Sequence, residues 1–373
     1  MKMVKLGKIV ENLDNKRIPL NDAERKAKTV KKLYPYVGAN NIVDYIDEYI
    51  FDEQILCVAE DGGSWGLCEK CANIYNGKTW VNNHAHVLRS NGKADLNFLR
   101  FFLNYSDLNK YITGTTRGKL TRSKLDNIDV PLPPIEEQIQ IATVLSKAEN
   151  LIAKRKESIE LLDEFVKSTF LEMFGDPVRN ERGWEKKKLV ELGSLDRGVS
   201  KNRPRNAPEL LGGIYPLIQT GDVTNAGLYI KNYSQTYSEL GLNQSKMWKK
   251  GTLCITIAAN IARTGILDFD ACFPDSVVGF VSNSQKVNSI YIHFLFGFIQ
   301  QILEKNAPQA AQKNINLEIL RSLKIPKPDI EAQNQFAEIV NKVEVLKEIY
   351  QKSLEELENL YGSLSQRAFR GEL

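Results

Sequence analysis

The chain contains the same module twice, and this repeat constrains its fold more than any other sequence feature. Residues 130–142 read VPLPPIEEQIQIA, and residues 325–337 read IPKPDIEAQNQFA, at an offset of 195 positions. Weaker matches lie upstream, where Leu56-Cys57 resembles Leu253-Cys254 and Tyr34-Pro35 resembles Tyr215-Pro216. An offset this long exceeds the period of any solenoid repeat. The 373 residues therefore predict two copies of one module of about 190 residues.

A long helix is predicted after each Pro-x-Pro junction, over residues 135–174 and 330–369, and only Gly362 interrupts either pattern. Residues at alternating spacings of four and three form one stripe along each helix, which is the pattern of a coiled-coil seam. Adding 195 to each stripe position of the first helix gives the second. Two such stripes most simply pair with each other, and the alternative is that each helix packs separately on its own globular segment. The apolar residues predicted to pair are Ile141, Leu145, Ile152, Ile159, Leu162, Val166, Val340, Val343, Tyr350, Leu354, Leu357 and Leu364.

The segments before the helices have mixed character. Short β-branched runs at residues 54–58, 252–257 and 276–281 predict strands, whereas residues 96–105 and 290–302 predict helices. We therefore predict an α+β fold, in which two globular mixed α/β domains are separated by two long helices that form an antiparallel coiled coil. This arrangement has an internal pseudo-two-fold repeat and returns Leu373 close to Met1. The predicted domains are residues 1–133, 134–176, 177–328 and 329–373.

Charge is distributed unevenly among these four segments. The two globular segments hold 20 Lys and Arg each, against 16 Asp and Glu in residues 1–133 and 12 in residues 177–328. Each helical segment holds five Lys and Arg against nine Asp and Glu. Basic globular segments beside acidic helices indicate that a polyanion binds the globular segments and not the helices.

Three loops have the composition of phosphate and base contacts. Residues 113–122 combine glycines, hydroxyls and three cations, residues 198–206 carry three cations beside a proline, and residues 309–316 are rich in amides. Hydroxyls and cations bind phosphate, Arg suits guanine, and amide side chains suit adenine. The alternative for each loop is a solvated turn. The candidate DNA-contacting residues are Arg117, Lys119, Thr121, Arg122, Lys201, Arg203, Arg205, Gln312, Lys313 and Asn314.

The sequence lacks the usual catalytic signatures. It contains no P-loop, no dinucleotide-binding fingerprint, no serine elbow and no Asn-Pro-Pro-aromatic tetrapeptide. Cys68, Cys71, His84 and His86 approximate a zinc ligand set, but His-x-His is too closely spaced for the usual finger. We therefore expect no catalytic residue, cofactor or metal site in this chain.

The longest apolar run, residues 290–299, is too short to cross a membrane, and the first residues have no apolar signal core. Five cysteines in a chain of this length suit a reducing compartment. We therefore expect a cytoplasmic protein that does not bind a membrane.

Together, the Pro131-Leu-Pro-Pro-Ile-Glu-Glu-Gln138 junction, its degenerate copy Pro326-Lys-Pro-Asp-Ile-Glu-Ala-Gln333, the heptad helices and the repeat resemble the specificity subunit of type I restriction–modification systems. The resemblance spans essentially the whole chain. It implies two target-recognition domains alternating with two conserved spacer helices, in a subunit that is not itself catalytic. Each domain would read one half of a bipartite double-stranded DNA target.

The resemblance also implies partners. The helices would set the spacer and dock methyltransferase subunits, of which two are expected, and through them restriction–translocase subunits. The partner subunits would use S-adenosylmethionine, ATP and Mg²⁺, while this chain would bind none of them. Two other classes are open to the sequence: a bifunctional enzyme with a cryptic nuclease or methyltransferase site, and a structural coiled-coil adaptor that does not bind DNA.

Overall fold

The computed structural model describes residues 1–373 apart from 115, 203, 259 and 307–314. Its contacts divide the chain into two compact units, one made of Met1–Glu157 with Lys352–Leu373 and the other of Ser158–Gln351. We call residues 1–133 the first head and residues 177–328 the second head. No helix among the described residues is long and apolar enough to cross a membrane.

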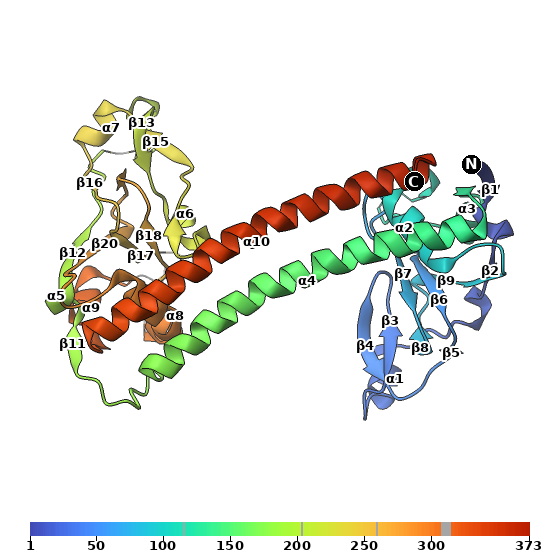
Figure 1. Ribbon diagram of the computed structural model, residues 1–373, viewed down its shortest axis with the longest axis horizontal. Coiled ribbons are helices and arrows are strands. Elements are labelled where there is room, and N and C mark those ends of the chain that lie inside the picture. Colours follow the sequence, from blue (N-terminus) through green and yellow to red (C-terminus); the bar gives the residue numbers. More distant parts are fainter. Residues whose placement is uncertain (115, 203, 259, 307–314) are drawn as a thin grey trace. The chain divides into compact units, whose positions relative to one another are not determined.

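The first head contains two four-stranded sheets, with strand orders β2-β9-β6-β7 and β4-β3-β8-β5, and a separate pair of strands, β1 and β10 (Figure 1). Helix α2 packs on the first of these sheets. The strands are β1 Lys2–Lys5, β2 Val10–Asn12, β3 Tyr34–Val37, β4 Ile42–Ile46, β5 Phe51–Asp52, β6 Ile55–Ala59, β7 Ala72–Tyr75, β8 Lys78–Val81, β9 Ala85–Ser90 and β10 Asp129–Leu132. The helices are α1 Asp22–Ala27, α2 Leu96–Tyr105 and α3 Arg122–Asp126, and three short 3-10 helices cover Leu6–Lys8, Asp14–Lys16 and Asn109–Tyr111.

The second head repeats this plan with a five-stranded sheet of order β12-β20-β17-β18-β14, a four-stranded sheet of order β15-β13-β19-β16, and the pair β11 and β21. The strands are β11 Lys186–Lys188, β12 Gly193–Arg197, β13 Leu211–Leu217, β14 Tyr229–Ile230, β15 Gln235–Tyr237, β16 Met247–Trp248, β17 Leu253–Thr256, β18 Thr264–Leu267, β19 Ala271–Cys272, β20 Val277–Ser282 and β21 Lys324–Pro326. The helices are α5 Leu189–Leu192, α6 Thr220–Asn225, α7 Glu239–Asn243, α8 Ser289–Asn306 and α9 Leu317–Ser322, with a 3-10 turn at Pro208–Leu210.

Strand pairing shows that the two heads are copies of one topology. Strand β3 pairs antiparallel with β4 and parallel with β8, and β13 likewise pairs antiparallel with β15 and parallel with β19. Strand β6 lies between β9 and β7, as β17 lies between β20 and β18. The weak sequence matches at Leu56-Cys57 and at Tyr34-Pro35 therefore mark equivalent strands. The predicted α+β class and internal repeat are confirmed.

Burial explains why these segments form strands. Every residue of the central strands β6 and β17 is buried, and all of them except Thr256 are apolar. In α2, side chains on one side of the helix fill the core above the sheet, among them Phe98, Leu99 and Phe102. The sequence-predicted strands at 54–58, 252–257 and 276–281 and the helices at 96–105 and 290–302 correspond to β6, β17, β20, α2 and α8.

The two long helices begin and end as the sequence predicts. Helix α4 spans Ile135–Phe174 and ends at Gly175, whose φ of +75° is the left-handed conformation that glycine adopts at helix ends. Helix α10 spans Ile330–Arg370 and continues through Gly362, where an added side chain would meet open space. Each helix runs from one unit into the other.

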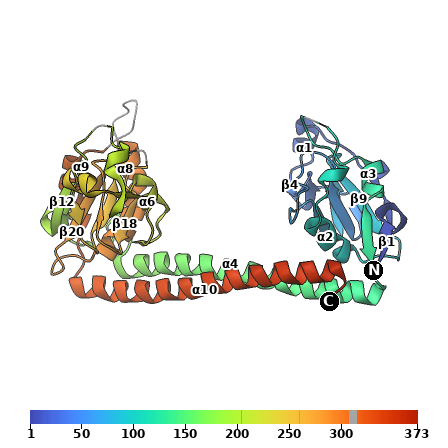
Figure 2. The same ribbon diagram turned by 90° about the horizontal axis from the view of Figure 1, so that it is seen from above.

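Within the first unit, α4 and α10 pack side by side and run antiparallel (Figure 2). The early α4 residues Ile141 and Leu145 share a core with Ala368 near the end of α10, and Lys156 pairs with Glu358 at 2.8 Å. Phe369 extends this contact onto the rings of α2. The Met1 side chain also lies against Gly371, so the two chain ends meet in this unit as expected.

Within the second unit, the late part of α4 packs on the early part of α10. Phe170 and Phe336 stack edge to face with ring centroids 5.5 Å apart, and Asp163 pairs with Lys347 at 2.8 Å. As α4 advances from 163 to 170, its partners in α10 fall from 347 to 336, so this packing is also antiparallel. The two helices therefore pair in both units instead of packing on separate heads.

The predicted seam residues lie on the covered side of the helices. Six are buried, namely Ile141, Leu145, Val166, Val340, Val343 and Leu354. Six are half-buried, namely Ile152, Ile159, Leu162, Tyr350, Leu357 and Leu364. Half-burial is what a pair of helices gives to seam residues where no third element covers them.

A buried glutamine explains why the junction sequence recurs. Gln138 donates from Nε2 to the Pro133 carbonyl at 2.8 Å, and its Oε1 accepts from the backbone N–H of Asp95 at 2.9 Å. Gln333 makes the same two bonds, to Pro328 at 2.8 Å and from Asn288 at 2.9 Å. Each glutamine thus joins the Pro-x-Pro turn to the start of a head helix, α2 or α8, and fixes where the long helix leaves its head.

Replacing Gln138 by Leu leaves a buried carbonyl and a buried N–H without partners, which costs about 2–3 kcal/mol. We expect the Gln138→Leu variant to accelerate amide hydrogen exchange in residues 93–105 and to leave the equivalent residues 286–298 unchanged. Gln140→Leu is the matched control, because Gln140 is exposed two positions away. Equal exchange in the two variants would show that the buried bonds do not hold the junction.

Candidate nucleic-acid interface

The predicted basic loop of the first head lies between α2 and α3 and is tied to the sheet. The backbones of Thr113 and Lys119 exchange two hydrogen bonds of 2.9 and 2.8 Å. Arg117 Nη2 lies 3.0 Å from an Asp61 carboxylate oxygen, and Lys119 Nζ lies 3.0 Å from Glu60. Both cations remain accessible, because their side chains are 65% and 49% exposed. The loop therefore presents cations whose positions are set by carboxylates at the end of β6.

Thr121 and Arg122 stand at the start of α3. Thr121 is the residue before the helix but makes no side-chain capping bond, so its hydroxyl is not used by the helix. Arg122 is 60% exposed and lies 3.8 Å from Asp126, one turn further on. The predicted residues of the first head thus lie on one short segment, and its three cations are exposed.

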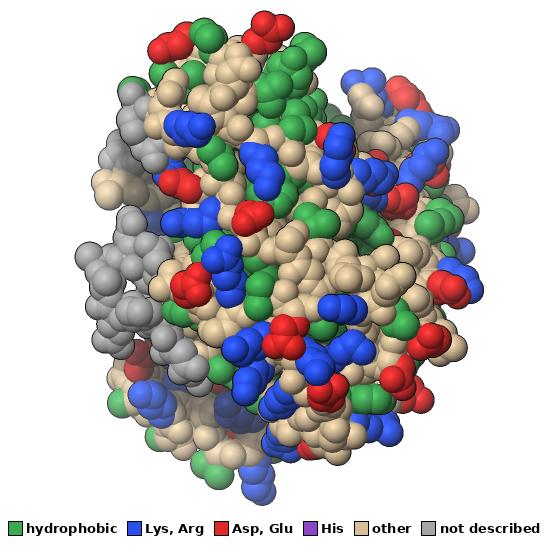
Figure 3. Space-filling view, turned by 90° about the vertical axis from the view of Figure 1, so that its left-hand side faces the viewer, with side chains coloured by type: hydrophobic (Ala, Val, Ile, Leu, Met, Phe, Trp, Pro, Cys, Tyr) green, Lys and Arg blue, Asp and Glu red, His purple; other side chains and the backbone are tan. Residues whose placement is uncertain are grey.

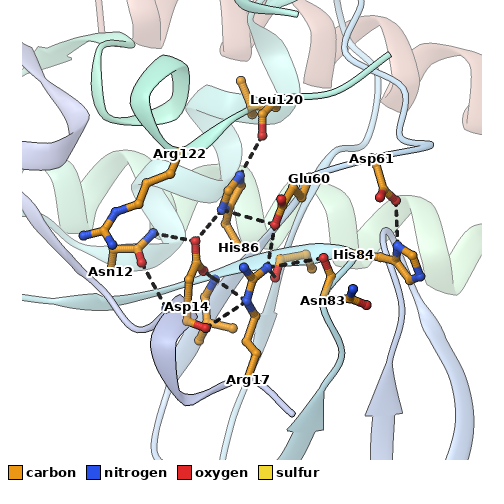
Figure 4. Close-up of polar contacts among 12 residues, drawn as sticks. Asn12, Asp14, Arg17, Glu60, Asp61, Asn83, His84, His86, Leu120 and Arg122 are labelled. Atoms are coloured by element: carbon orange, nitrogen blue, oxygen red, sulfur yellow. Dashed lines mark hydrogen bonds and ion pairs between the residues drawn. The ribbon is translucent and has the colours of Figure 1, made fainter. Parts of the chain in front are cut away.

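Beneath this loop lies a polar network that the sequence did not predict (Figure 4). The ring of His86, which is 1% exposed, contacts an Asp14 carboxylate oxygen through Nδ1 at 2.6 Å and the Leu120 carbonyl through Nε2 at 2.7 Å. A carbonyl oxygen only accepts, so Nε2 carries a hydrogen and donates it. His86 therefore fastens the end of the basic loop to the segment that follows β2.

Arg17 and Lys119 complete the network. Arg17 donates to Glu60 at 2.6 Å and to the Ala85 carbonyl at 2.7 Å, and Glu60 also holds Lys119. Burial raises the pKa of the Asp14 carboxyl, but hydrogen bonds from His86, Val87 and Asn12 outweigh it and lower that pKa below its usual value. The pKa of Glu60 is likewise lowered, since Arg17 and Lys119 outweigh burial. Both carboxylates stabilise the fold at neutral pH, and this stabilisation is lost as the pH falls through their lowered values.

Asp14, Glu60 and His86 bring three potential metal-ligand atoms within 4.8 Å of one another. The same carboxylates already bind Arg17 and Lys119, and both ring nitrogens of His86 are engaged, so the network is charge-compensated without a metal ion.

The cysteine and histidine residues that approximate a zinc ligand set in the sequence make separate contacts in the structure. Cys71 is buried against the Leu103 carbonyl and Cys68 is exposed, while His84 pairs with Asp61 at 2.8 Å.

In the second head, two of the six predicted residues can be described. Lys201 is exposed, and Arg205 forms an ion pair with Asp275. Arg203, Gln312, Lys313 and Asn314 lie outside the described residues. Figure 3 looks onto this head and shows Lys and Arg side chains spread over the face, with acidic side chains set among them. Exposed cations of the second head include Lys186, Lys188, Lys246, Lys249, Lys250, Lys286 and Lys324.

The comparisons with known proteins agree with this architecture. The family described as "Type I restriction modification DNA specificity domain" matches twice, over residues 1–161 and 181–359. The chain therefore belongs to this family. The two matched regions each contain one head and most of the helix that follows it, which agrees with the repeat and confirms the predicted resemblance.

Relatives and solved structures of the same family resemble nearly the whole chain. A putative type I restriction enzyme specificity subunit of Haemophilus influenzae is 26% identical over 355 residues, covering 91% of this chain and 87% of the relative. The MjaVIII specificity subunit of Methanocaldococcus jannaschii is 24% identical, covering 95% and 89%. The crystal structure of the type I S subunit from M. genitalium is similar in fold, with a TM-score of 0.67 at 14% identity and coverage of 99% and 96%.

Replacing His86 by Leu removes both contacts of the imidazole ring and leaves Asp14 buried without its main partner. We expect a loss of about 2–4 kcal/mol in the unfolding free energy of the first head, measured by urea denaturation followed by circular dichroism. His84→Ala is the control, because its side chain is 42% exposed, and it should cost less than about 0.5 kcal/mol. Equal effects of the two changes would contradict the assigned role of the network.

Proposed function

We propose that this chain is the DNA-reading subunit of a type I restriction–modification complex and is not catalytic by itself. Each head reads one half of a bipartite duplex target, so residues 1–133 and 177–328 act as the two target-recognition domains. The segments 134–176 and 329–373 act as spacer helices. The observation that carries the proposal is the duplicated head, with an excess of cations in each copy.

In this proposal the helix pair fixes the distance between the two half-targets. A helix of 40 residues is about 60 Å long at 1.5 Å per residue, which corresponds to roughly 18 base pairs of duplex. The half-targets would then lie within two turns of the DNA. The antiparallel packing of α4 on α10 within each unit supports a fixed distance between the half-targets, because two paired helices form a stiffer linker than a single chain segment would.

The outer surfaces of the helices are proposed to dock methyltransferase subunits, two of them if each repeat docks one, and through these the restriction–translocase subunits. Apolar side chains that the helix pair does not cover support this role. On α4 they are Ile139, Val144, Leu151, Leu161 and Phe165, and on α10 they are Val345, Ile349 and Leu360. S-adenosylmethionine, ATP and Mg²⁺ would then bind the partner subunits and not this chain.

The purified chain should bind duplex DNA with an affinity that falls steeply as salt rises, because phosphate contacts release counterions. It should neither cleave nor methylate DNA until methyltransferase and restriction subunits are added. Binding is measured by fluorescence anisotropy between 50 and 200 mM salt, and methylation by transfer of a labelled methyl group. Affinity that does not change with salt would favour the structural adaptor, and methylation or cleavage by the chain alone would favour the bifunctional enzyme.

A further inference from the structure

In each head, the segment that joins the first strand of one sheet to the first strand of the other sheet is basic. In the first head it joins β2 to β3 over residues 13–33, and in the second it joins β12 to β13 over residues 198–210. The second segment contains the predicted Lys201, Arg203 and Arg205. The first contains Lys26, Lys28, Lys31 and Lys32 in seven positions without an acidic residue, and it is not one of the three predicted loops.

A single carboxylate holds the end of this first segment in shape. The backbone N–H of Val30 donates to Asp47 at 2.9 Å, and that of Lys31 donates to both Asp47 oxygens at 2.9 and 3.0 Å. The N–H of Asp47 in turn donates to the Lys28 carbonyl at 2.8 Å. Lys32 has a φ of 56°, which folds the chain back towards β3. Residues 29–33, which we call the 29–33 turn, are thus fixed by Asp47 although their side chains are at the surface.

The fixed turn displays apolar and cationic side chains together. Val30 is 79% exposed and Leu33 is 52% exposed. Lys31 and Lys32 are exposed, and neither forms an ion pair with another described residue. By contrast, Lys28 is held by Glu48 at 2.6 Å. Two unpaired cations beside exposed aliphatic side chains match the phosphates and the groove floor of duplex DNA.

The turn also stands at the free end of its head. It lies between α1 and β3, and α1 is at the end of the first head away from α4 and α10 (Figure 2). This end is therefore not occupied by the helix pair of its own unit. A polyanion could approach it without displacing any described element of the first head.

We propose that the 29–33 turn is a preformed DNA-contacting element of the first head, in which Lys31 and Lys32 bind phosphates and Val30 enters a groove. This inference rests on the proposed function and extends it to residues outside the predicted loops. Its occupant is duplex DNA, because the equivalent segment of the second head is also cationic. Because Asp47 already holds the shape of the turn, binding to DNA does not require a disordered segment to become ordered.

The test compares three variants of the full chain on a 40-base-pair duplex pool of random sequence. Lys31→Ala with Lys32→Ala should lower the slope of log affinity against log salt by about 1.8, because each lost phosphate contact removes about 0.9. At 0.15 M salt, this corresponds to binding roughly 10- to 30-fold weaker. The matched control is Lys8→Ala with Lys93→Ala, which removes two other exposed cations of the same head and should leave the slope unchanged.

Asp47→Ala separates shape from charge. Removing a negative charge should tighten DNA binding if only net charge matters, whereas loss of the fixed turn should weaken it. We expect weaker binding, together with faster hydrogen exchange at Val30 and Lys31. If Asp47→Ala disturbs the head beyond the turn, the salt slope of the double lysine variant decides the test.

An unchanged salt slope in the double lysine variant would overturn the inference, and so would tighter binding by an Asp47→Ala variant whose head is intact. In either case, salt-dependent binding by the wild-type chain would still support the proposed function. If the wild-type chain itself shows no salt-dependent binding, the proposed function fails first. The two failures are therefore distinguishable.

Discussion

Antiparallel pairing between two copies of the same helix is the interaction on which the rest of this structure depends. In the first unit the beginning of α4 meets the end of α10, and in the second unit the end of α4 meets the beginning of α10. Because the helices are copies, the same face of the same helix is used at both ends. A stripe of this length cannot be buried by one small head, so each helix needs the other.

The junction between helix and head depends on very few residues. Gln138 and Gln333 are buried at equivalent positions of the recurring junction and make the same bonds, although the heads themselves share little sequence. The heads differ in their loops and in the number of strands in one sheet, but each is attached to its helix in the same way. This combination allows the exposed surfaces of the heads to diverge while the attachment stays constant, which agrees with the proposal that the two heads read different half-targets.

Sequence reasoning located the helices to within one residue because their heptad pattern persists over 40 positions and stops at Gly175. It located the central strands because β6 and β17 are buried on both faces and read as apolar runs. It did not find the network of Asp14, Glu60 and His86, whose members are far apart in the chain and meet only through strand pairing. It also missed the 29–33 turn, because Asp47 and other acidic residues nearby mask its lysines when charge is counted by segment.

The account can be tested most directly by shortening both helices by one heptad and reading the DNA target again. Deleting residues 155–161 from α4 and 350–356 from α10 keeps the seam in phase and removes about 10 Å from each helix. The methylated sequences of cells that express each version with its partner subunits then reveal the target. The account predicts the same two half-targets, separated by about three fewer base pairs. An unchanged spacer, or a target that is not in two parts, would contradict it.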